Sequence, residues 1–279
     1  MKHLFFLSVL LAAAATALGQ QPDTLDNGVP EAVSNPWAML GVTWDSKYVW
    51  RGFEVFDDKS AVHFLGDVSL FDTGFGLSVA GHRANSSGFE KLERWDYTAY
   101  YQNGLFPEDS PYATNFRLGF VYYNYPQRNR SQSLDLEEGH LILAWPNILP
   151  VQGLQPSYVL VKTWPVRDDG QLPDAASGWL HIFMLDYAFT VPGITPEIYQ
   201  QTVRLHSELV YNDGWSPTPE FPNPGHEFSH AVFGASTDFA FGKTNNLIFT
   251  PALYYQLTMD HAINDDDELW ASLALKFLF

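Results

Sequence analysis

The chain has 279 residues, of which 16% are aromatic and only 17% are charged, and its formal net charge is −17. Globular proteins carry roughly 25% charged residues on average, and a chain so poor in charge and rich in aromatic rings is not intrinsically disordered. The acidic balance argues against a nucleic-acid partner, whose phosphates require a basic face, and 0 Cys excludes disulfide scaffolds, thiolate metal sites and thiol nucleophiles.

The first residues have the pattern of a secretory signal peptide. Lys2 supplies a positive charge, Leu4 to Leu11 form a mostly apolar run, and small residues follow as far as Gly19. The run is too short to cross a membrane comfortably as a helix. We therefore expect residues 1–19 to be a signal peptide and residues 20–36, which are polar and contain prolines, to be a flexible periplasmic leader.

From Trp37 onwards, apolar residues alternate with small or polar ones. In the clearest segment, Phe75, Leu77 and Val79 share one face, because successive side chains of a strand point to opposite faces. We predict about twelve such strands. They lie near residues 37–43, 61–71, 75–82, 94–102, 115–125, 138–145, 156–164, 178–189, 201–211, 228–241, 246–257 and 268–279. The segments near 138, 156 and 178 alternate poorly, and residues 141–143 and 180–185 are apolar on both faces.

The connections between these strands alternate in length. Residues 72–74 and 242–244 form tight turns, and the links 146–155 and 191–197 are moderate and nearly uncharged. The other set is long and mostly acidic, and comprises residues 45–60, 83–93, 126–137, 165–177, 212–227 and 258–267. Residues 103–113 form one longish link where a short one is expected. Short turns at one end and long loops at the other are typical of outer-membrane barrels.

The fold class that these patterns predict is an all-β, closed antiparallel transmembrane β-barrel over residues 37–279, in the outer membrane of a Gram-negative bacterium. Hydrocarbon offers no hydrogen-bond partner, so an open sheet edge is costly there and a barrel has none. A soluble β-sandwich with an aromatic core is the alternative. Aromatic girdles are expected at both membrane interfaces. The candidates are Tyr48, Trp50, Trp95 and Tyr211 at the loop end, and Trp37, Phe71, Phe75 and Phe279 at the turn end.

The last segment sets Leu273, Leu275, Phe277 and Phe279 on one face. A final Phe that closes an alternating strand resembles the sorting signal read by the bacterial barrel-assembly machinery. We therefore expect this machinery and the outer-membrane lipid to be partners of the chain, and no nucleic acid. The sequence leaves open whether the barrel forms oligomers, since apolar outward residues fit lipid and a neighbouring subunit equally well.

A motif follows the first predicted strand, and a Tyr-rich run ends the fifth. The motif consists of Ser46, Tyr48, Trp50, Arg51 and Gly52. The Tyr-rich run consists of Tyr122, Tyr123, Tyr125 and Pro126. With the acidic pair that follows, this series resembles the TorF family of porins over residues 37–145. Lys47 stands where that pattern usually has an acid. The resemblance implies an exported barrel and passive transport, and it identifies no catalytic residues.

Ionisable residues occur on the polar faces of the predicted strands. An Arg or Lys that faced lipid would cost about 2–4 kcal/mol at the membrane midplane, so these groups should point inward. They are His63, Asp67, His82, Asp96, Arg117, His140, Arg204, His206 and Glu208. They predict the lining of a pore, with a hydrogen-bonded network that plugs the barrel as the alternative. About eight strands leave a filled interior and about sixteen leave a water channel, so twelve strands fit either.

The predicted loops carry acidic clusters at Asp57-Asp58, Asp168-Asp169 and Asp265 to Glu268. Such clusters can concentrate cations by focusing the electric field. They can also bridge Ca²⁺ or Mg²⁺ through carboxylate oxygens, or form a solvated surface. The spaced ligands and the glycine of an EF-hand loop are absent from residues 264–268.

One pair of residues suggests an enzyme. Ser229 lies beside His230, and about twelve strands would also suit an outer-membrane phospholipase-like hydrolase. Neighbours in a strand point to opposite faces, so we expect Ser229 and His230 not to pair. The sequence thus predicts a porin-like channel for passive diffusion of small polar solutes that favours cations, with no catalytic residue, cofactor or metal ligand. A structural or adhesive barrel with a plugged lumen that binds divalent cations or partners is the alternative, and the hydrolase is a further one.

Overall fold

The structure is a computed structural model that describes residues 37–71, 73–195, 198–218, 224–241 and 245–279. The expected signal peptide, residues 1–19, and the expected leader, residues 20–36, lie outside the described residues, as does the predicted turn at 242–244.

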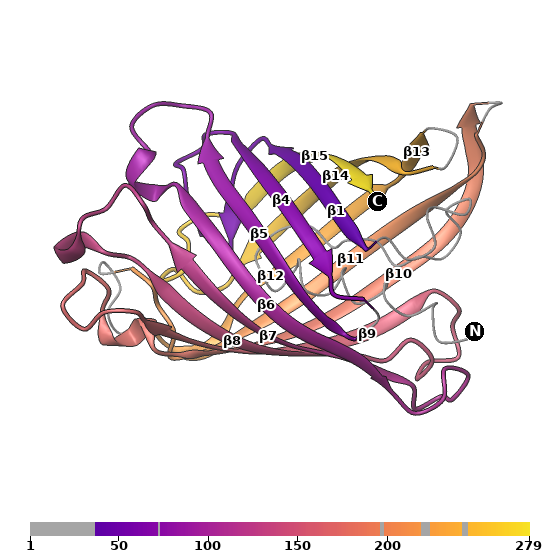
Figure 1. Ribbon diagram of the computed structural model, residues 1–279, viewed down its shortest axis with the longest axis horizontal. Helices are drawn as coiled ribbons and strands as arrows, with labels where there is room; N and C mark the ends of the chain where they lie inside the picture. Colours follow the sequence, from indigo (N-terminus) through magenta and orange to yellow (C-terminus); the bar gives the residue numbers. More distant parts are fainter. Residues whose placement is uncertain (1–36, 72, 196–197, 219–223, 242–244) are drawn as a thin grey trace.

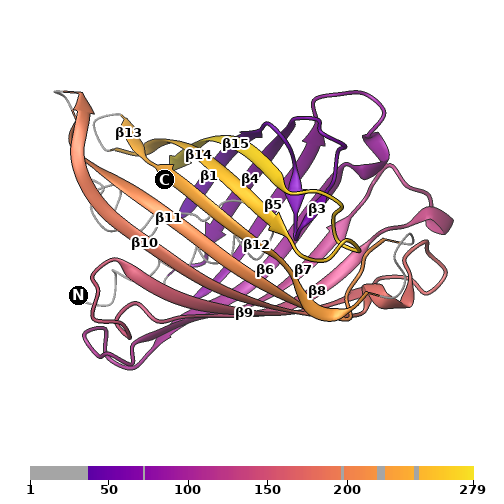
Figure 2. The same ribbon diagram turned by 180° about the vertical axis from the view of Figure 1, so that it is seen from behind.

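The strands form one closed antiparallel sheet (Figures 1 and 2). Its members are β1 (Ala38–Asp45), β4 (Ala61–Ser69), β5 (Phe75–Ala84), β6 (Arg94–Leu105), β7 (Thr114–Asn124), β8 (Leu136–Ala144), β9 (Leu154–Pro165), β10 (Trp179–Thr195), β11 (Ile198–Asp213), β12 (His226–Thr237), β13 (Phe239–Phe241), β14 (Leu247–Thr258) and β15 (Glu268–Leu278). β1 pairs with both β4 and β15, and β12 pairs with β14, which closes the ring. Since β13 continues β12 along β14, the described residues form a barrel of twelve strands, and the predicted fold class is confirmed.

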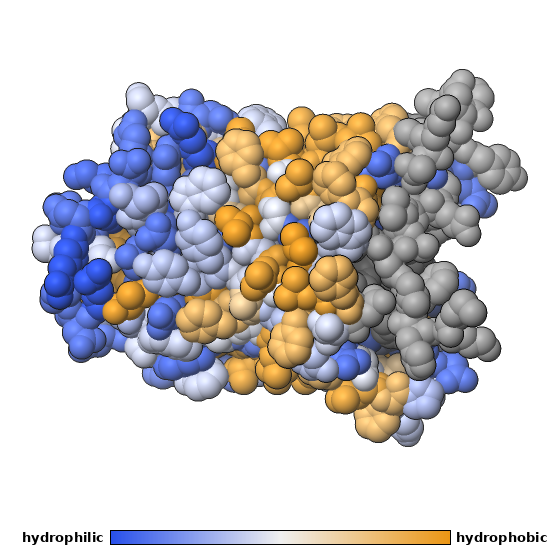
Figure 3. All heavy atoms as spheres, in the orientation of Figure 1, coloured by the Kyte–Doolittle hydropathy of each residue, from blue (hydrophilic) through white to orange (hydrophobic). Residues whose placement is uncertain are grey.

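The wall of the barrel has an apolar outer face. In β15, Leu273, Leu275 and Phe277 are exposed, whereas Ala274 and Lys276 between them are buried. Figure 3 shows apolar residues gathered in a band across the middle of the barrel, with a hydrophilic surface over the end that carries the long loops. This is the outer surface that a hydrocarbon layer requires.

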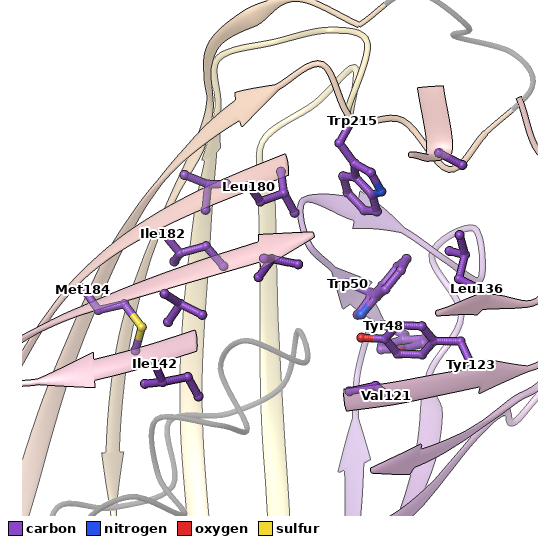
Figure 4. Close-up of a cluster of buried hydrophobic side chains, with 14 of the residues drawn as sticks. Tyr48, Trp50, Val121, Tyr123, Leu136, Ile142, Leu180, Ile182, Met184 and Trp215 are labelled. Carbon is purple, nitrogen blue, oxygen red and sulfur yellow. The ribbon is translucent and has the colours of Figure 1, made fainter. Parts of the chain in front are cut away.

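The turn-end girdle candidates Trp37, Phe71, Phe75 and Phe279 are all exposed, as is Trp95 at the loop end. The prediction for Tyr48 and Trp50 is wrong: the two side chains are only 1% and 3% exposed. Both lie inside the barrel, because the segment that carries them folds inward instead of lying at the rim (Figure 4).

Among the residues that the structure describes, three short 3-10 helices lie in the long loops, namely η1 (Glu90–Leu92), η2 (Arg130–Gln132) and η3 (Asp174–Ala176). Within the described part of the chain, no helix has the length and apolar character needed to cross a membrane. The longish link between β6 and β7 lies at the turn end, as the strand order demands. The moderate link predicted at 191–197 is wrong, because β10 continues as far as Thr195 and β11 begins at Ile198.

A β-bulge changes the orientation of one residue in β12. Val210 pairs with His230 and Tyr211 pairs with Phe228, so Ser229 is the extra residue between them. Ser229 and His230 are each 1% exposed, and Ser229 Oγ lies 3.0 Å from His230 Nδ1. The expectation that these two neighbours cannot pair is therefore wrong, because the bulge breaks the alternation on which it rested.

Candidate functional site: a hairpin across the barrel lumen

The connection between β1 and β4, residues 46–60, folds back as a small hairpin, which we name the lumen hairpin. Its two strands are β2 (Val49–Trp50) and β3 (Phe53–Glu54), with Trp50 paired to Phe53. Arg51 and Gly52 form the turn with φ of 51° and 89°. Positive φ at both central residues is the geometry of a type I′ turn, which matches the twist of the flanking strands and favours glycine.

Aromatic side chains seat the hairpin on one part of the wall. The ring of Tyr48 stacks on His82 of β5 with centroids 5.3 Å apart. Trp50 makes edge contacts with Tyr123 of β7 at 5.5 Å and with Trp215, in the loop after β11, at 5.7 Å. Figure 4 shows Trp50 lying between Trp215 and Tyr123. These rings form the centre of a buried cluster inside the loop end of the barrel.

A buried ion pair holds the turn of the hairpin. Arg51 Nη2 donates to Glu138 Oε2 of β8 at 2.5 Å. Glu138 also accepts a hydrogen bond from Tyr123 Oη at 2.7 Å and lies 3.0 Å from His140 Nδ1. Both charged side chains are almost fully buried, at 2% and 0% exposure. Removing one partner of such a pair leaves the other charge buried and uncompensated, which is strongly destabilising.

The same turn contacts the opposite side of the barrel. The carbonyl oxygen of Gly52 accepts hydrogen bonds from Gln256 Nε2 of β14 at 2.9 Å and from Asn264 Nδ2, in the loop before β15, at 3.3 Å. With Arg51 bound to β8 and Gly52 bound to β14, the lumen hairpin reaches across the interior. It is therefore positioned to set the width of any passage at the loop end.

The base of the hairpin carries a charged cluster. Lys47 pairs with Glu54 at 3.4 Å, with Glu268 and with Asp58. Burial lowers the pKa of Lys47, but hydrogen bonds to Asp58 and Glu268 and the charge of Glu54 outweigh it, so the net pKa lies above its usual range. The hydrogen bond from Lys47 likewise holds the pKa of Asp58 below its ordinary value. The Lys47 ammonium and the Asp58 carboxylate thus stay charged at neutral pH.

Replacing Gly52 with alanine should destabilise the protein more than the same change at Gly88. Both glycines have positive φ, which costs a side-chain-bearing residue about 1–2 kcal/mol. At Gly52, an added Cβ would also lie 2.5 Å from Ile263 and 2.7 Å from His230, whereas nothing lies within 4 Å at Gly88. We expect an additional loss of about 1–3 kcal/mol for Gly52→Ala, measured by denaturant unfolding. Equal losses would show that the turn does not pack against the wall.

A continuous set of polar contacts runs along the wall beneath the hairpin. Arg94 Nε lies 2.7 Å from Asp96 Oδ1, and His82 Nε2 lies 2.9 Å from Asp96 Oδ2. His82 Nδ1 then lies 2.8 Å from His63 Nδ1, and His63 Nε2 lies 3.2 Å from Asp45. Ser272 of β15 donates to Asp45. This chain brings together three of the predicted lining residues on β4, β5 and β6.

The other six predicted lining residues also take inward-facing positions. His140 contacts Glu138, as described above. Arg117 lies over the ring of Tyr100, with its guanidinium carbon 3.4 Å from the centroid, and Tyr100 donates to Asp67 at 2.9 Å.

On β11, Arg204 binds Asp238 at 2.8 Å, and His206 lies 2.7 Å from Asp186 and 3.7 Å from Glu208. All nine predicted residues thus point to the interior as partners in ion pairs, hydrogen bonds or ring contacts. Their role as the lining of a conducting path stays a prediction.

An apolar part of the inner wall was not predicted from the sequence. Inward-facing apolar side chains on β8, β9, β10 and β11 belong to the buried cluster that contains Trp50. They are Ile142, Val159, Val161, Leu180, Ile182, Met184 and Val210. Figure 4 shows several of them on neighbouring strands. The signal was present as the poor alternation near residues 138, 156 and 178. Residues 141–143 and 180–185 are apolar on both faces, and their inward-facing side chains belong to the buried cluster.

In the described residues, no hydrogen bond links His230 Nε2 of the Ser229–His230 pair to a further group. His230 Nε2 lies 3.8 Å from Glu208 Oε1, which is beyond hydrogen-bond distance. Gly52 of the lumen hairpin packs directly on the His230 ring. In the described part of the chain, no group of three or more His, Cys, Asp or Glu residues is placed to hold a metal ion.

No family model and no curated protein sequence matches the chain. Among solved structures, the barrel is similar to a KdgM porin, with a TM-score of 0.51 and 13% identity over 86% of this chain and 99% of that one. It is also similar to a NanC porin, with a TM-score of 0.50 and 10% identity over 87% of this chain and 100% of that one. The resemblance to the TorF family stays a prediction. The chain therefore has the barrel fold seen in these porins.

Proposed function

We propose that the protein is a porin-like channel in the outer membrane of a Gram-negative bacterium, through which small polar solutes diffuse passively. The observation that carries this proposal is the two-faced wall. Its outer face presents an apolar band, and much of its inner face carries ionisable and hydrogen-bonding side chains. A wall of this kind separates lipid from a polar interior.

Recording from planar lipid bilayers tests the proposal. The full mature chain, refolded in detergent, should give stepwise increases in current as single molecules insert. Mobility on a detergent gel with and without boiling shows independently that the barrel is folded. A folded protein that inserts without conducting would contradict the proposed channel.

A second candidate is a structural or adhesive barrel whose lumen is closed. The specific observation in its favour is the lumen hairpin, whose Tyr48, Trp50 and Phe56 are almost completely buried. In this case the wild-type protein is silent in bilayers, and a variant that lacks the hairpin conducts. The two candidates therefore differ in the wild-type recording alone.

The proposed channel favours cations because of its acidic loops. Asp57, Asp168, Asp169, Asp265 and Asp266 are all exposed at the loop end. Their conversion to asparagine should lower the cation-to-anion permeability ratio, measured as the reversal potential across a KCl gradient. The effect should be large at about 0.01 M salt and nearly absent at about 1 M, where the Debye length is roughly 3 Å. An unchanged ratio at low salt would contradict a cation-focusing role of the loops.

The remaining proposals concern partners. Insertion by the barrel-assembly machinery would use the last strand, β15, together with Phe279 that follows it; the apolar side of this segment is exposed. Bridging of the acidic loops by Ca²⁺ or Mg²⁺ stays a prediction, and so does the oligomeric state. Lipid hydrolysis is the weakest alternative, since Ser229 and His230 are buried inside the barrel and not on its lipid-facing side.

A further inference from the structure

Two histidines of neighbouring strands face each other beneath the lumen hairpin. His63 of β4 pairs directly with His82 of β5, and each residue is 4% exposed. Their Nδ1 atoms lie 2.8 Å apart, which is hydrogen-bond distance. An imidazole nitrogen either donates through its N–H or accepts through its lone pair. The contact therefore needs a proton on one of the two Nδ1 atoms, since two lone pairs or two N–H groups at this distance would repel each other.

The outer nitrogens of both rings face carboxylates. His82 Nε2 lies 2.9 Å from Asp96 Oδ2, and His63 Nε2 lies 3.2 Å from Asp45 Oδ2. An ionised carboxylate only accepts hydrogen bonds, so each Nε2 carries a proton. The pair then holds three protons on four nitrogens, and one ring is an imidazolium. Arg94 binds the two oxygens of Asp96 at 2.7 and 2.9 Å. Two positive charges thus balance two negative ones.

Both histidine rings support the lumen hairpin through Tyr48. The centroid of the Tyr48 ring lies 4.7 Å from that of His63 and 5.3 Å from that of His82. The Tyr48 hydroxyl accepts a hydrogen bond from Arg94 Nη2 at 3.1 Å. Because Tyr48 is 1% exposed and closely packed, the two imidazoles cannot move apart without displacing it. Among the described residues, the ionisable groups that face the pair are Asp45 of β1, Arg94 and Asp96 of β6, and Tyr48 of the hairpin.

We propose that the His63–His82 pair is a proton-operated latch for the lumen hairpin. A free imidazole takes up a proton at about pH 6.5 and a carboxyl group at about pH 3.9. On acidification, a fourth proton therefore goes to the Nδ1 that accepts the shared hydrogen bond. Both Nδ1 atoms then carry N–H groups, and a second imidazolium forms beside the first. The rings separate, Tyr48 is displaced, and the hairpin moves away from β4 and β5.

Single-channel recording at two pH values tests the latch, and this readout rests on the proposed channel function. Recording in about 1 M KCl, where the Debye length is roughly 3 Å, suppresses the influence of charges in the exposed loops. The wild-type conductance should rise about twofold between about pH 7.5 and about pH 4.5, because the passage widens as the hairpin moves.

Two variants assign the response to the pair. His63→Asn keeps a hydrogen-bonding group beside His82 but removes one of the two titrating rings, so its conductance should be the same at both pH values. His261→Asn changes an exposed histidine in the loop before β15. It is the matched control and should respond as the wild type does. A response to acid that persists in His63→Asn overturns the latch. If His63→Asn does not fold, His82→Asn makes the same test from the other ring.

Hydrogen exchange in detergent tests the latch without any conduction. The backbone amides of residues 46–60, corrected for the intrinsic pH dependence of exchange, should exchange about tenfold faster at about pH 4.5 than at about pH 7.5 in the wild type. Equal corrected rates in the wild type overturn the latch, whether or not the protein conducts. Faster exchange in a protein that does not conduct supports the latch and overturns the channel instead.

Discussion

Removing the lumen hairpin should raise the single-channel conductance about threefold or more. The barrel wall allows this deletion, because Asp45 at the end of β1 pairs directly with Ala61 at the start of β4. Residues 47–58 can therefore be replaced by a four-residue Gly-Ser linker that closes an ordinary hairpin. The deletion takes away the side chains that reach from β8 to β14, so the passage at the loop end becomes as wide as the ring of strands permits.

The loop between β5 and β6 provides the control for this deletion. Residues 85–88 are exposed, and they connect two strands at the same end of the barrel. Their replacement by Gly-Ser-Gly-Ser should leave the conductance unchanged. If the hairpin deletion also leaves it unchanged, with the barrel shown to be folded on a detergent gel, another part of the chain sets the width of the passage.

The strands were predictable from the sequence because each strand shows the alternation of apolar and polar residues within its own segment. A lipid-facing surface imposes an apolar residue at every second position, whatever the neighbouring strand contains. In β15, for example, the outward set Leu273, Leu275 and Phe277 can be read without reference to β14 or β1. Strand identity and the sorting of long and short links therefore follow from local pattern, and the closed ring follows from the need to leave no edge.

The lumen hairpin was not predictable in the same way. Tyr48 and Trp50 follow a strand that ends near the membrane surface, where aromatic residues are expected. Their burial depends on partners that are distant in sequence, such as His82, Tyr123 and Trp215. Local composition predicts the same position for an aromatic side chain at the rim of the barrel and for one inside it. Only the poor alternation in β8 to β10 indicated that side chains from elsewhere in the chain pack against the inner wall.

The β-bulge at Ser229 illustrates a second limit. Alternation predicts the direction of a side chain only while the register is regular, and one extra residue turns Ser229 to the side that His230 occupies. Nothing in the residues His226 to His230 marks the position of that extra residue. The nine inward-facing ionisable residues lie on regular stretches of strand. The side of the sheet to which they point could therefore be predicted from the alternation of side chains, whereas the pairing of Ser229 with His230 could not.

Replacing Arg51 with methionine should cost about 3–5 kcal/mol of unfolding free energy, because it leaves the Glu138 carboxylate buried without its cation. The matched control is Arg130→Met, which breaks an ion pair with Asp169 whose side chains are 72% and 59% exposed. That change should cost about 0–1 kcal/mol, since solvent screens the exposed pair. Denaturant unfolding of each variant, refolded in detergent, measures both values.

A second substitution distinguishes loss of a charge partner from loss of packing. In the Arg51→Met/Glu138→Gln variant, the uncompensated charge is gone, and the amide can still bind Tyr123 and His140. This variant should therefore be more stable than Arg51→Met alone, and the two changes should be non-additive by about 0.5–3 kcal/mol. The released turn should also make the channel current noisier, because Arg51 is the hairpin's link to β8. Additive losses with an unchanged current would mean that the ion pair does not hold the hairpin across the lumen.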